Sequence, residues 1–411
     1  FIKRRLWVAL HRYMGLSMAV FLVIAGLTGS LLVFYDDLDA ALNPHLYRAH
    51  PPSENTPLLD PLVIRERLLA TYPTIDINWI TLKPSTEHAL RIRVSPRQTS
   101  GKTVSPPLVF NEIFVNPYTG EVQGTRTWGR ITDGLENLLP FLYKLHYQLA
   151  LGQFGTLLMG IIALLWTIDC FAGIYLTFPG KSRPSPCRQT PKTSVPITWL
   201  KRWRKAWRIR WKSRGYAFNF DLHVASGLWL WLLLFVLAWS SVAFNLGIVY
   251  YPVMNMAFDF QDPRQFVTDS QLETRHQARL SYAEIRDIAL THLHSHPAAP
   301  VTHIEPTGMS YIKRYRAYQY RFRSDRDVHE HWGRTRLYID AYSGAILGMN
   351  IPTGETSGDT VSTWIKTLHM AGVWGLPYKI LLSITGGMVA LLSITGVIMW
   401  WRKRSRRVQH C

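Results

Sequence analysis

Four histidines occupy matching places in the two halves of the sequence. His11 lies six residues after Arg5, near the start of the first apolar stretch, and His223 has the same position in the third. His146 and His369 lie where the second and fourth apolar stretches begin. A histidine inside or at the edge of such a stretch is costly unless it has a partner or a function. The four therefore form two layers, and each half contributes one histidine to each layer.

Two imidazoles that face each other from different helices are what a haem iron with two histidine ligands requires. We therefore expect two b-type haems, one held by His11 and His223, the other by His146 and His369. No Cys-x-x-Cys-His motif occurs, so the haems would be bound without covalent attachment. Interfacial or packing histidines are the alternative. Met14 and Met370 are alternative axial ligands, although methionine at such positions more often packs.

Long apolar helices must position these histidines. Each of four apolar stretches has 25 or more residues, and roughly 20 suffice to cross a bilayer. We expect transmembrane helices at 7–35, 146–178, 217–250 and 369–401, exterior domains at 36–145 and 251–368, a basic loop at 179–216 and a tail at 402–411.

Charge predicts the topology of these helices. Residues 181–214 hold 12 Lys or Arg and no Asp or Glu, and both ends of the chain are also basic. By the positive-inside rule, both termini and this loop face the cytoplasm of a bacterial inner membrane, and the exterior domains face the periplasm. The net charge of +19 is thus a topology signal. It is not read as a nucleic-acid-binding surface.

Several kinds of site are excluded. The three cysteines, Cys170, Cys187 and Cys411, all lie outside the two exterior segments, which rules out a disulfide framework or a cysteine-ligated iron–sulfur cluster there. No G-x-G-x-x-G follows a strand and there is no P-loop, so no flavin or nicotinamide site is indicated. The electron donor would be a separate cytoplasmic reductase or membrane quinol. We expect no catalytic acid or nucleophile.

The two halves repeat each other. The pattern L-H-x-x-x-G-L begins at position 10 and again at position 222, and L-H precedes both the second and the fourth span. The exterior stretches 115–122 and 339–346 each read as a strand, a turn closed by Gly, and a strand. The expected fold is an internally duplicated α-helical membrane protein with four transmembrane helices and two small α+β domains.

These motifs resemble those of the PepSY-associated transmembrane family, and within it the inner-membrane ferric-siderophore reductases that act on ferrioxamine-type substrates. The resemblance covers nearly the whole chain. It implies two haems, two small periplasmic PepSY-like domains, and reduction of a periplasmic ferric siderophore, which releases iron as Fe(II). A haem-free anchor whose exterior domains bind peptide or regulate a protease is one alternative. A transporter is another, although only Gly386-Gly387 suggests a broken span.

Asp169 is the carboxylate within the second span, and an intramembrane carboxylate is a functional candidate by default. It could pair with Arg12, neighbour a haem, serve a quinol site, or make a structural hydrogen bond. Trp364 and Trp374 flank His369, either as a substrate platform or as an aromatic belt at the membrane surface.

Two further clusters lie in the second exterior segment. The first contains the alternate histidines His292, His294 and His296, with His329 and His331 further on. Alternate histidines can bind Zn or Cu, although solvent-exposed surface histidines are the more ordinary interpretation. A group of arginines could attract an anionic ferric chelate or form the polar face of strands, and it comprises Arg314, Arg316, Arg321, Arg323, Arg326, Arg334 and Arg336.

Overall fold

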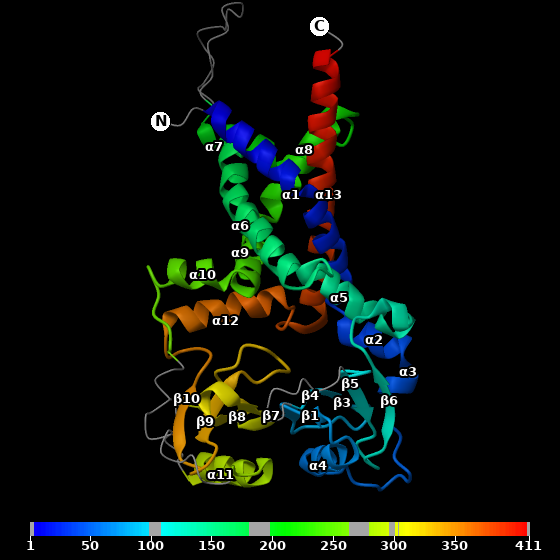
Figure 1. The fold of residues 1–411 in the computed structure, drawn as a ribbon. Coiled ribbons are helices and arrows are strands. Elements are labelled where there is room, and N and C mark those ends of the chain that lie inside the picture. The colour runs from blue at the N-terminus through cyan, green and yellow to red at the C-terminus, as the bar shows by residue number, and fades with distance from the viewer. Residues whose placement is uncertain are drawn as a thin grey trace, which may run out of the picture.

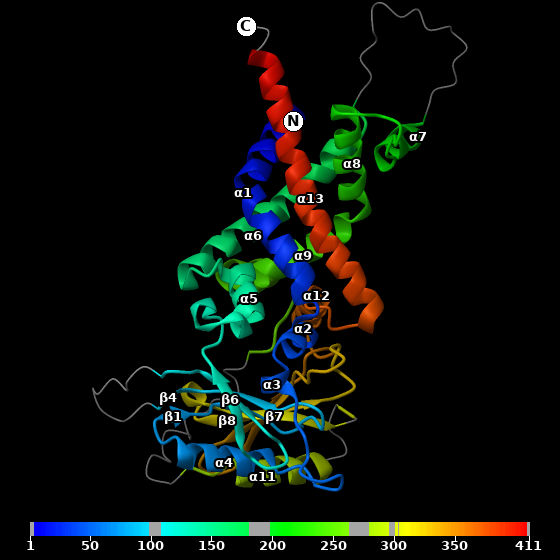
Figure 2. The same cartoon turned by 90° about the vertical axis from the view of Figure 1, so that its right-hand side faces the viewer.

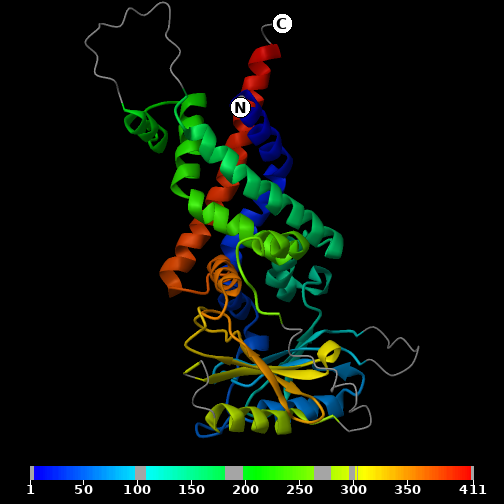
Figure 3. The same cartoon turned by 90° about the vertical axis from the view of Figure 1, so that its left-hand side faces the viewer.

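A computed structural model describes residues 4–97, 108–180, 198–262, 279–295, 301–302 and 304–408. Long helices form a bundle that carries both termini at one end, which we call the basic end (Figure 1). All of the strands lie beyond the opposite end of the bundle, in a part that we call the sheet domain (Figures 2 and 3). The histidines lie in the bundle and in the short helices between it and the sheet domain.

Three helices of the bundle are long and apolar enough to cross a membrane: α1 (Arg4–Leu32), α6 (Gly152–Thr177) and α13 (Gly375–Val408). The fourth expected span, 217–250, is not one continuous helix. It consists of α8 (Tyr216–Trp229) and α9 (Trp231–Asn245), which are bent by 70° relative to each other. Among the described residues there are therefore three helices that could span a membrane, or four candidate spans if the bent pair counts as one.

The bend falls between two tryptophans whose indoles bond outside their own helix. Trp229 donates to the backbone carbonyl of Trp207 at 3.1 Å, and Trp231 donates to that of Cys170 at 2.8 Å. These bonds fix the two sides of the break to different neighbours. The expectation that only Gly386-Gly387 would interrupt a span is wrong, because this pair lies inside unbroken α13.

Small residues bring α1 and α13 together. A Cβ on Gly26 would lie 2.5 Å from the carbonyl oxygen of Gly386, so neither position tolerates a side chain without movement. Ser30 donates to the Ser383 carbonyl at 2.7 Å, and Ser383 donates back to the Ser30 carbonyl at 3.0 Å. Close backbone approach with hydroxyl bonds is typical of helix pairs in membranes.

Two shorter helices precede the second and last spans: α5 (Leu138–Gln148) and α12 (Ser357–His369). Each is followed by a turn in which a glycine, Gly152 or Gly375, has a positive φ (63° and 52°), a conformation that glycine adopts without strain. The long helices thus begin at these glycines rather than at His146 and His369. Both histidines lie on separate helices that run along the junction with the sheet domain (Figure 1).

The remaining helices connect these parts. α2 and α3 continue from the first span towards the sheet domain, while α7 and α10 flank the bent pair (Figure 1). Their bounds are α2 (Tyr35–Leu42), α3 (Pro44–Tyr47), α7 (Trp199–Trp203) and α10 (Gly247–Met254), with short 3-10 turns at Ile131–Asp133, Leu135–Asn137, Arg204–Trp207 and Lys313–Tyr315.

A five-stranded antiparallel sheet is the centre of the sheet domain. Its order is β10 (Ile346–Asn350), β9 (Thr335–Asp340), β8 (Ala317–Arg323), β7 (Glu305–Ile312) and β2 (Trp79–Thr81). A three-stranded sheet contains β3 (Leu90–Arg93), β5 (Glu112–Val115) and β6 (Val122–Arg126), and β1 (Ile75–Asp76) pairs with β4 (Ser95–Pro96). Strand β2 belongs to the first exterior segment, yet it completes the sheet of the second.

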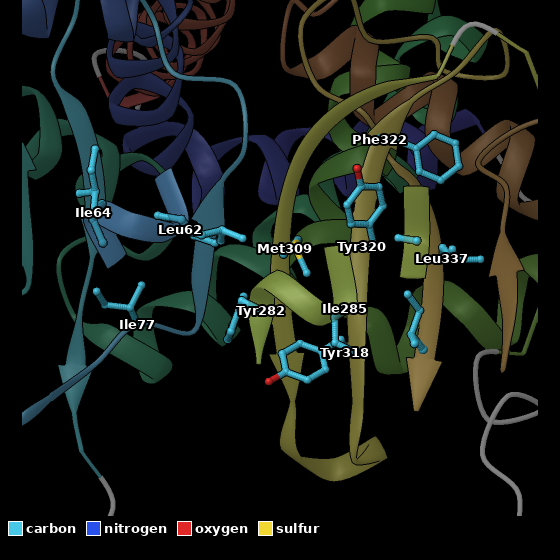
Figure 4. Packing of buried hydrophobic residues seen from close by; sticks show 14 of the residues in the cluster. Leu62, Ile64, Ile77, Tyr282, Ile285, Met309, Tyr318, Tyr320, Phe322 and Leu337 are labelled. Atoms are coloured by element: carbon cyan, nitrogen blue, oxygen red, sulfur yellow. The ribbon is translucent and has the colours of Figure 1, made fainter. Parts of the chain in front are cut away.

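One hydrophobic core spans both exterior segments. Ile64 and Ile77 from the first and Ile285 and Tyr320 from the second belong to the same cluster of buried side chains (Figure 4). Helices α4 (Pro61–Thr71) and α11 (Tyr282–Ser295) cover the face of the sheets that points away from the bundle (Figures 1 and 3). In the described residues the two segments pack as one unit rather than as two separate domains.

The two turns predicted from the repeated exterior motif are present as β-hairpins, β5–β6 and β9–β10. Asn116 Oδ1 accepts the backbone N–H of Tyr118 at 2.9 Å, and Asp340 Oδ1 accepts that of Tyr342 at the same distance. The glycine that closes each turn has a φ of 78° or 74°.

A buried ion network attaches the sheet domain to the first span. Arg126 of β6 donates to Glu112 of β5 at 2.6 Å and to Asp39 of α2 at 2.7 Å, and all three side chains are fully buried. Because α2 follows α1 almost directly, this network fixes the orientation of the sheet domain relative to the bundle.

Candidate functional site

The structure brings together both of the histidine pairs expected from the sequence. His11 of α1 faces His223 of α8, with ring centres 6.2 Å apart and planes inclined by 64°. His146 of α5 faces His369 of α12, with ring centres 6.3 Å apart and planes inclined by 71°. The first pair lies near the basic end and the second at the junction with the sheet domain, so we call them the basic-end pair and the junction pair.

Each of the four histidines is held through its Nδ1 atom. At the junction, His146 Nδ1 lies 3.0 Å from both the Ala25 carbonyl and Thr28 Oγ1 of α1, and His369 Nδ1 lies 2.7 Å from Ser240 Oγ of α9. At the basic end, His223 Nδ1 lies 3.1 Å from the Leu392 carbonyl and 3.0 Å from Thr395 Oγ1. His11 Nδ1 lies 2.8 Å from Asp169 Oδ1.

These contacts determine which nitrogen carries the proton. A carbonyl or carboxylate oxygen only accepts, so Nδ1 must donate to Ala25, Leu392 and Asp169. The Ser240 hydroxyl gives its own hydrogen to the Val236 carbonyl at 2.6 Å and can therefore only accept from His369. Each neutral imidazole thus keeps its lone pair on Nε2. Histidines that ligate metals are oriented in this way by a hydrogen bond on the other nitrogen.

The spacing of the rings suits a metal between them. Imidazole nitrogens bind metals at ~2 Å, so two opposed imidazoles on one metal have ring centres roughly 6 Å apart once both ring radii are added. Both observed separations match this value. Among the described residues no group of three or more His, Cys, Asp or Glu could hold a bare ion. Two histidine ligands suit a metal that brings its other ligands with it, as haem iron does.

A cavity of about 900 Å³ opens at the basic-end pair, at the upper end of the ~300–1,000 Å³ usual for ligand sites. His11, His223 and Asp169 line it, together with the glycines Gly15, Gly173, Gly227 and Gly396. Six basic side chains lie on its wall against two acids, and they are Arg4, Arg12, Lys205, Arg208, Arg210 and Lys403. The cavity is thus apolar in its depth and basic at its rim, which suits a flat apolar ligand with carboxylate groups.

Glycines also adjoin three of the four rings. A Cβ on Gly29 would lie 3.0 Å from His146, one on Gly173 would lie 3.7 Å from His11, and one on Gly396 would lie 3.4 Å from His223. Two other glycines, which follow His146 and His369 in the sequence, have different neighbours. Gly155 makes room for the Gln148 carbonyl, and Gly372 makes room for the His329 ring.

The two pairs are stacked along the bundle. His146 is bonded to Thr28, which lies 17 residues after His11 on the same helix, so the pairs are roughly 25 Å apart at a rise of 1.5 Å per residue. Apolar side chains fill the space between them, among them Met18, Leu22 and Leu234, with Trp166 packed against the cluster. No titratable group of this cluster lies between the pairs apart from Cys170.

Asp169 makes a hydrogen bond to a neighbouring helix, which is one of the roles considered from the sequence. Its partner is His11, a candidate ligand, and no hydrogen bond or ion pair joins it to Arg12 in the described residues. Leu392 is the counterpart of Asp169 in the second half, because it lies as many residues after His369 as Asp169 lies after His146. The backbone carbonyl of Leu392 accepts a hydrogen bond from His223. The basic-end pair is therefore asymmetric, with a carboxylate on one histidine and uncharged acceptors on the other.

Sequence reasoning missed the hydroxyl acceptors Thr28, Ser240 and Thr395. A signal for two of them was present, because Thr28 and Ser240 each lie 17 residues after the histidine that opens their half. Met14 and Met370 are absent from the cavity wall, which instead includes Met18 and Met399.

The other predicted residues lie in the sheet domain or beside it. Trp364 and Trp374 are 40% and 61% exposed and line a second cavity of about 360 Å³, together with Asp325, Asp327 and Glu330. The Zn or Cu site considered as the less ordinary interpretation is not brought together in the described residues, because His292 and His294 alternate on helix α11 and so point in different directions. His296, Cys187 and Cys411 lie outside the described residues.

His329 has a structural role. Its Nδ1 accepts the backbone N–H groups of His331 and Trp332, both at 3.1 Å, and its ring stacks on Trp332 with centres 4.6 Å apart. Burial, and then the nearby Arg334, lower the pKa of His329 to about 4. The neutral ring thereby holds its loop against the turn that follows α12, which it meets at Gly372.

Comparison with known proteins adds one finding. The sequence profile of a family described as "PepSY-associated TM region" matches residues 8–403. No curated protein gives a match.

Proposed function

The chain belongs to the PepSY-associated transmembrane family, and we propose that it is a di-haem electron-transfer protein that reduces a ferric siderophore. The proposal rests chiefly on the two facing histidine pairs, in which every Nδ1 is hydrogen-bonded and every Nε2 keeps its lone pair. A haem bound between such imidazoles carries one electron at a time as its iron alternates between the ferric and ferrous states.

The chain's own residues account for binding and insulation. The histidines would hold the iron at each layer, and their hydroxyl, carbonyl and carboxylate partners fix the ring orientations. The basic rim of the larger cavity suits the carboxylates of a haem, while the apolar side chains between the layers exclude water. Two cofactors divide a crossing of ~30 Å of hydrocarbon into shorter steps.

The direction of transfer follows from the proposed topology. Basic termini and the basic loop favour a cytoplasmic location of the basic end in a bacterial inner membrane, with the sheet domain in the periplasm. Each ferric ion takes up one electron and leaves as Fe(II). A membrane quinol gives two electrons and two protons and so serves two ferric ions. A cytoplasmic reductase is the other donor that we consider.

A visible absorption spectrum of the detergent-purified protein tests this proposal. Protein made in haem-replete cells is expected to contain about two haems per chain and to give a sharp α band after dithionite reduction. His11→Ala and His369→Ala should each remove one haem, from different layers. A colourless protein would refute the proposal and favour a haem-free anchor whose sheet domain binds peptide.

One observation favours a second candidate, a transporter. Discontinuous helices near the middle of the membrane are typical of transporter sites, and α8 and α9 form such a pair. This candidate predicts uptake of substrate into vesicles by haem-free protein. Uptake that depends on haem, or no uptake at all, would exclude it.

A further inference from the structure

Two arginines on neighbouring strands of the sheet domain face each other with the same charge. Arg321 of β8 and Arg336 of β9 are direct partners in the antiparallel register, so their side chains leave the same face of the sheet. Like charges placed directly opposite destabilise a sheet. Arg334, two residues before Arg336, and Lys366 of α12 add to the same group, and we call these four residues the basic cluster.

No acid forms an ion pair with the basic cluster in the described residues, although Asp327 lies near Arg334 and Asp359 lies near Lys366. Within the part of the chain that the structure describes, none of the four residues forms an ion pair, whereas Arg323 on the same strand pairs with Glu305. Both of these acids are already hydrogen-bonded to other groups. Asp327 accepts from Ser324 and Thr335 and from the backbone of Arg334, and Asp359 accepts from Gln261 and Thr356. Arg336 Nε is buried with no hydrogen-bond partner.

Holding these cations together carries an electrostatic cost. Burial, and then the neighbouring Arg336, lower the pKa of Arg321 to about 10. Burial, and then Arg336, lower the pKa of Arg334, while Asp327 opposes this shift. Burial, and then Arg334, lower the pKa of Lys366, while Asp359 opposes it. Half-buried like charges without counter-ions oppose folding, and an anion bound among them would relieve that cost.

Neighbouring side chains hold the Arg321 guanidinium in place without any ligand. Gly308 leaves room for the Trp79 ring to lie across strand β7, since a Cβ there would be 2.2 Å from the ring. The Arg321 guanidinium stacks on this ring at 4.7 Å, and its Nε donates to Gln319 Oε1 at 2.9 Å. A planar guanidinium held in this way presents its remaining N–H donors in a fork that matches a carboxylate.

The basic cluster also lies next to the junction pair. Its face of the sheet is opposite the core face covered by α11, so it is directed towards the bundle (Figures 1 and 3). Lys366 precedes His369 by three residues on α12, which corresponds to ~4.5 Å along the helix. A ligand held by the cluster would thus be close to the candidate haem site on this side of the membrane.

We propose that the basic cluster binds an anionic, carboxylate-bearing ferric chelate as the substrate, an assignment that rests on the proposed function above. The cluster selects for negative charge by four cations that form no ion pair in the described residues. It would disfavour neutral or cationic hydroxamate chelates of the ferrioxamine type, which lack the charge that relieves the repulsion.

Gallium(III) citrate is a suitable probe because gallium cannot be reduced to a stable divalent ion, so binding is measured without electron transfer. Isothermal titration of the full chain in detergent should show binding to the wild type. Arg336→Gln should weaken it tenfold or more, since a charge-assisted hydrogen bond is lost. Arg314→Gln, the matched control, removes the same charge from an exposed turn residue and should change the affinity less than twofold.

A thermal melt of the ligand-free protein separates a binding role from a structural one. Removing one of two repelling cations should leave the Tm of Arg336→Gln unchanged or raised. A lowered Tm would mean that the guanidinium stabilises the fold, and together with unchanged gallium citrate binding would overturn the proposal.

Four further outcomes would also overturn it. One is equal binding by the Arg336→Gln and Arg314→Gln variants, and another is no binding by a wild type that carries two haems. A third is binding in phosphatidylcholine nanodiscs that disappears in phosphatidylglycerol nanodiscs, which would assign the cluster to lipid phosphate. Loss of haem in Arg336→Gln would assign it to the carboxylates of the haem. A colourless wild type that still binds gallium citrate would refute the proposed function while keeping the anion site.

Discussion

Replacing Asp169 with leucine removes the one hydrogen-bond acceptor that His11 Nδ1 has among the described residues. Leucine has the same branching as aspartate, and it is the residue found at the related position 392. The change also removes a buried charge from a span, which by itself favours insertion of the helix. A loss of haem in this variant would therefore report on His11 rather than on a failure of α6 to form.

The size of the effect follows from the number of acceptors. Groups that orient a metal-bound histidine typically contribute 10–100-fold in metal affinity, or ~1.4–2.8 kcal/mol at 1.4 kcal/mol per factor of ten. Asp169 is the single acceptor of His11 and carries a charge, so we place Asp169→Leu at the upper end of this range. Thr395→Val leaves His223 bonded to the Leu392 carbonyl and should lie at or below the lower end.

Haem titration of haem-free protein in detergent measures both variants, with apomyoglobin as a competing acceptor. Asp169→Asn completes the comparison, because it keeps an acceptor oxygen but loses the negative charge. It should retain the affinity while raising the reduction potential of that haem, since less negative charge near the iron favours the ferrous state. Wild-type affinity in Asp169→Leu, or equal losses in Asp169→Leu and Thr395→Val, would refute this account of the site.

Three other changes have distinct expected outcomes. Arg126→Met leaves the buried Asp39 carboxylate without its cation, while Glu112 keeps the more distant Arg91 and Arg93. The change should cost about 3–5 kcal/mol of stability, seen as a large fall in Tm; a shift under 1 °C would contradict it. Ser240→Ala should lower haem retention at the junction pair, whereas Ser241→Ala, whose hydroxyl bonds only to a backbone carbonyl, should not; equal effects would argue against hydroxyl orientation of His369. Burial lowers the pKa of His329 from 6.5 to about 4, so the folded protein binds this proton less readily than the unfolded chain does. The free energy of unfolding should therefore decrease as the pH falls from 6.5 towards 4, by at most about 3 kcal/mol. His329→Gln should show a flatter dependence of Tm on pH.

Part of this arrangement follows directly from the sequence. Long apolar runs and regular spacing predict the three unbroken spans and bring His11 opposite His223, because a helix fixes the depth of each residue in the membrane. The two Gly-closed hairpins were predictable for a similar reason, since the Asn or Asp and the Gly act within a few residues of each other.

The rest depends on contacts between distant residues, which leave no local pattern. The bend at Leu230 has neither Pro nor Gly beside it, and what distinguishes it is a pair of indole bonds to residues 22 and 61 positions away. The pairing of Arg321 with Arg336 depends on a strand register that composition does not reveal. Asp169 was recognisable as unusual, but its choice of His11 over Arg12 required three dimensions.

The pairing of β2 with β7 has a consequence for the synthesis of the chain. Thr81 bonds to Thr307, which is made 226 residues later. At ~5–20 residues per second, the ribosome needs roughly 10–45 s to produce the partner strand. During that interval the first exterior segment is already made, yet its edge strand has no neighbour, and an open edge is a template for aggregation. The strand has only three residues and is followed by Lys83 and Pro84, features that limit unwanted pairing. Maturation of this protein should therefore be sensitive to pauses in translation between the two segments, and to factors that shield unfinished sheets.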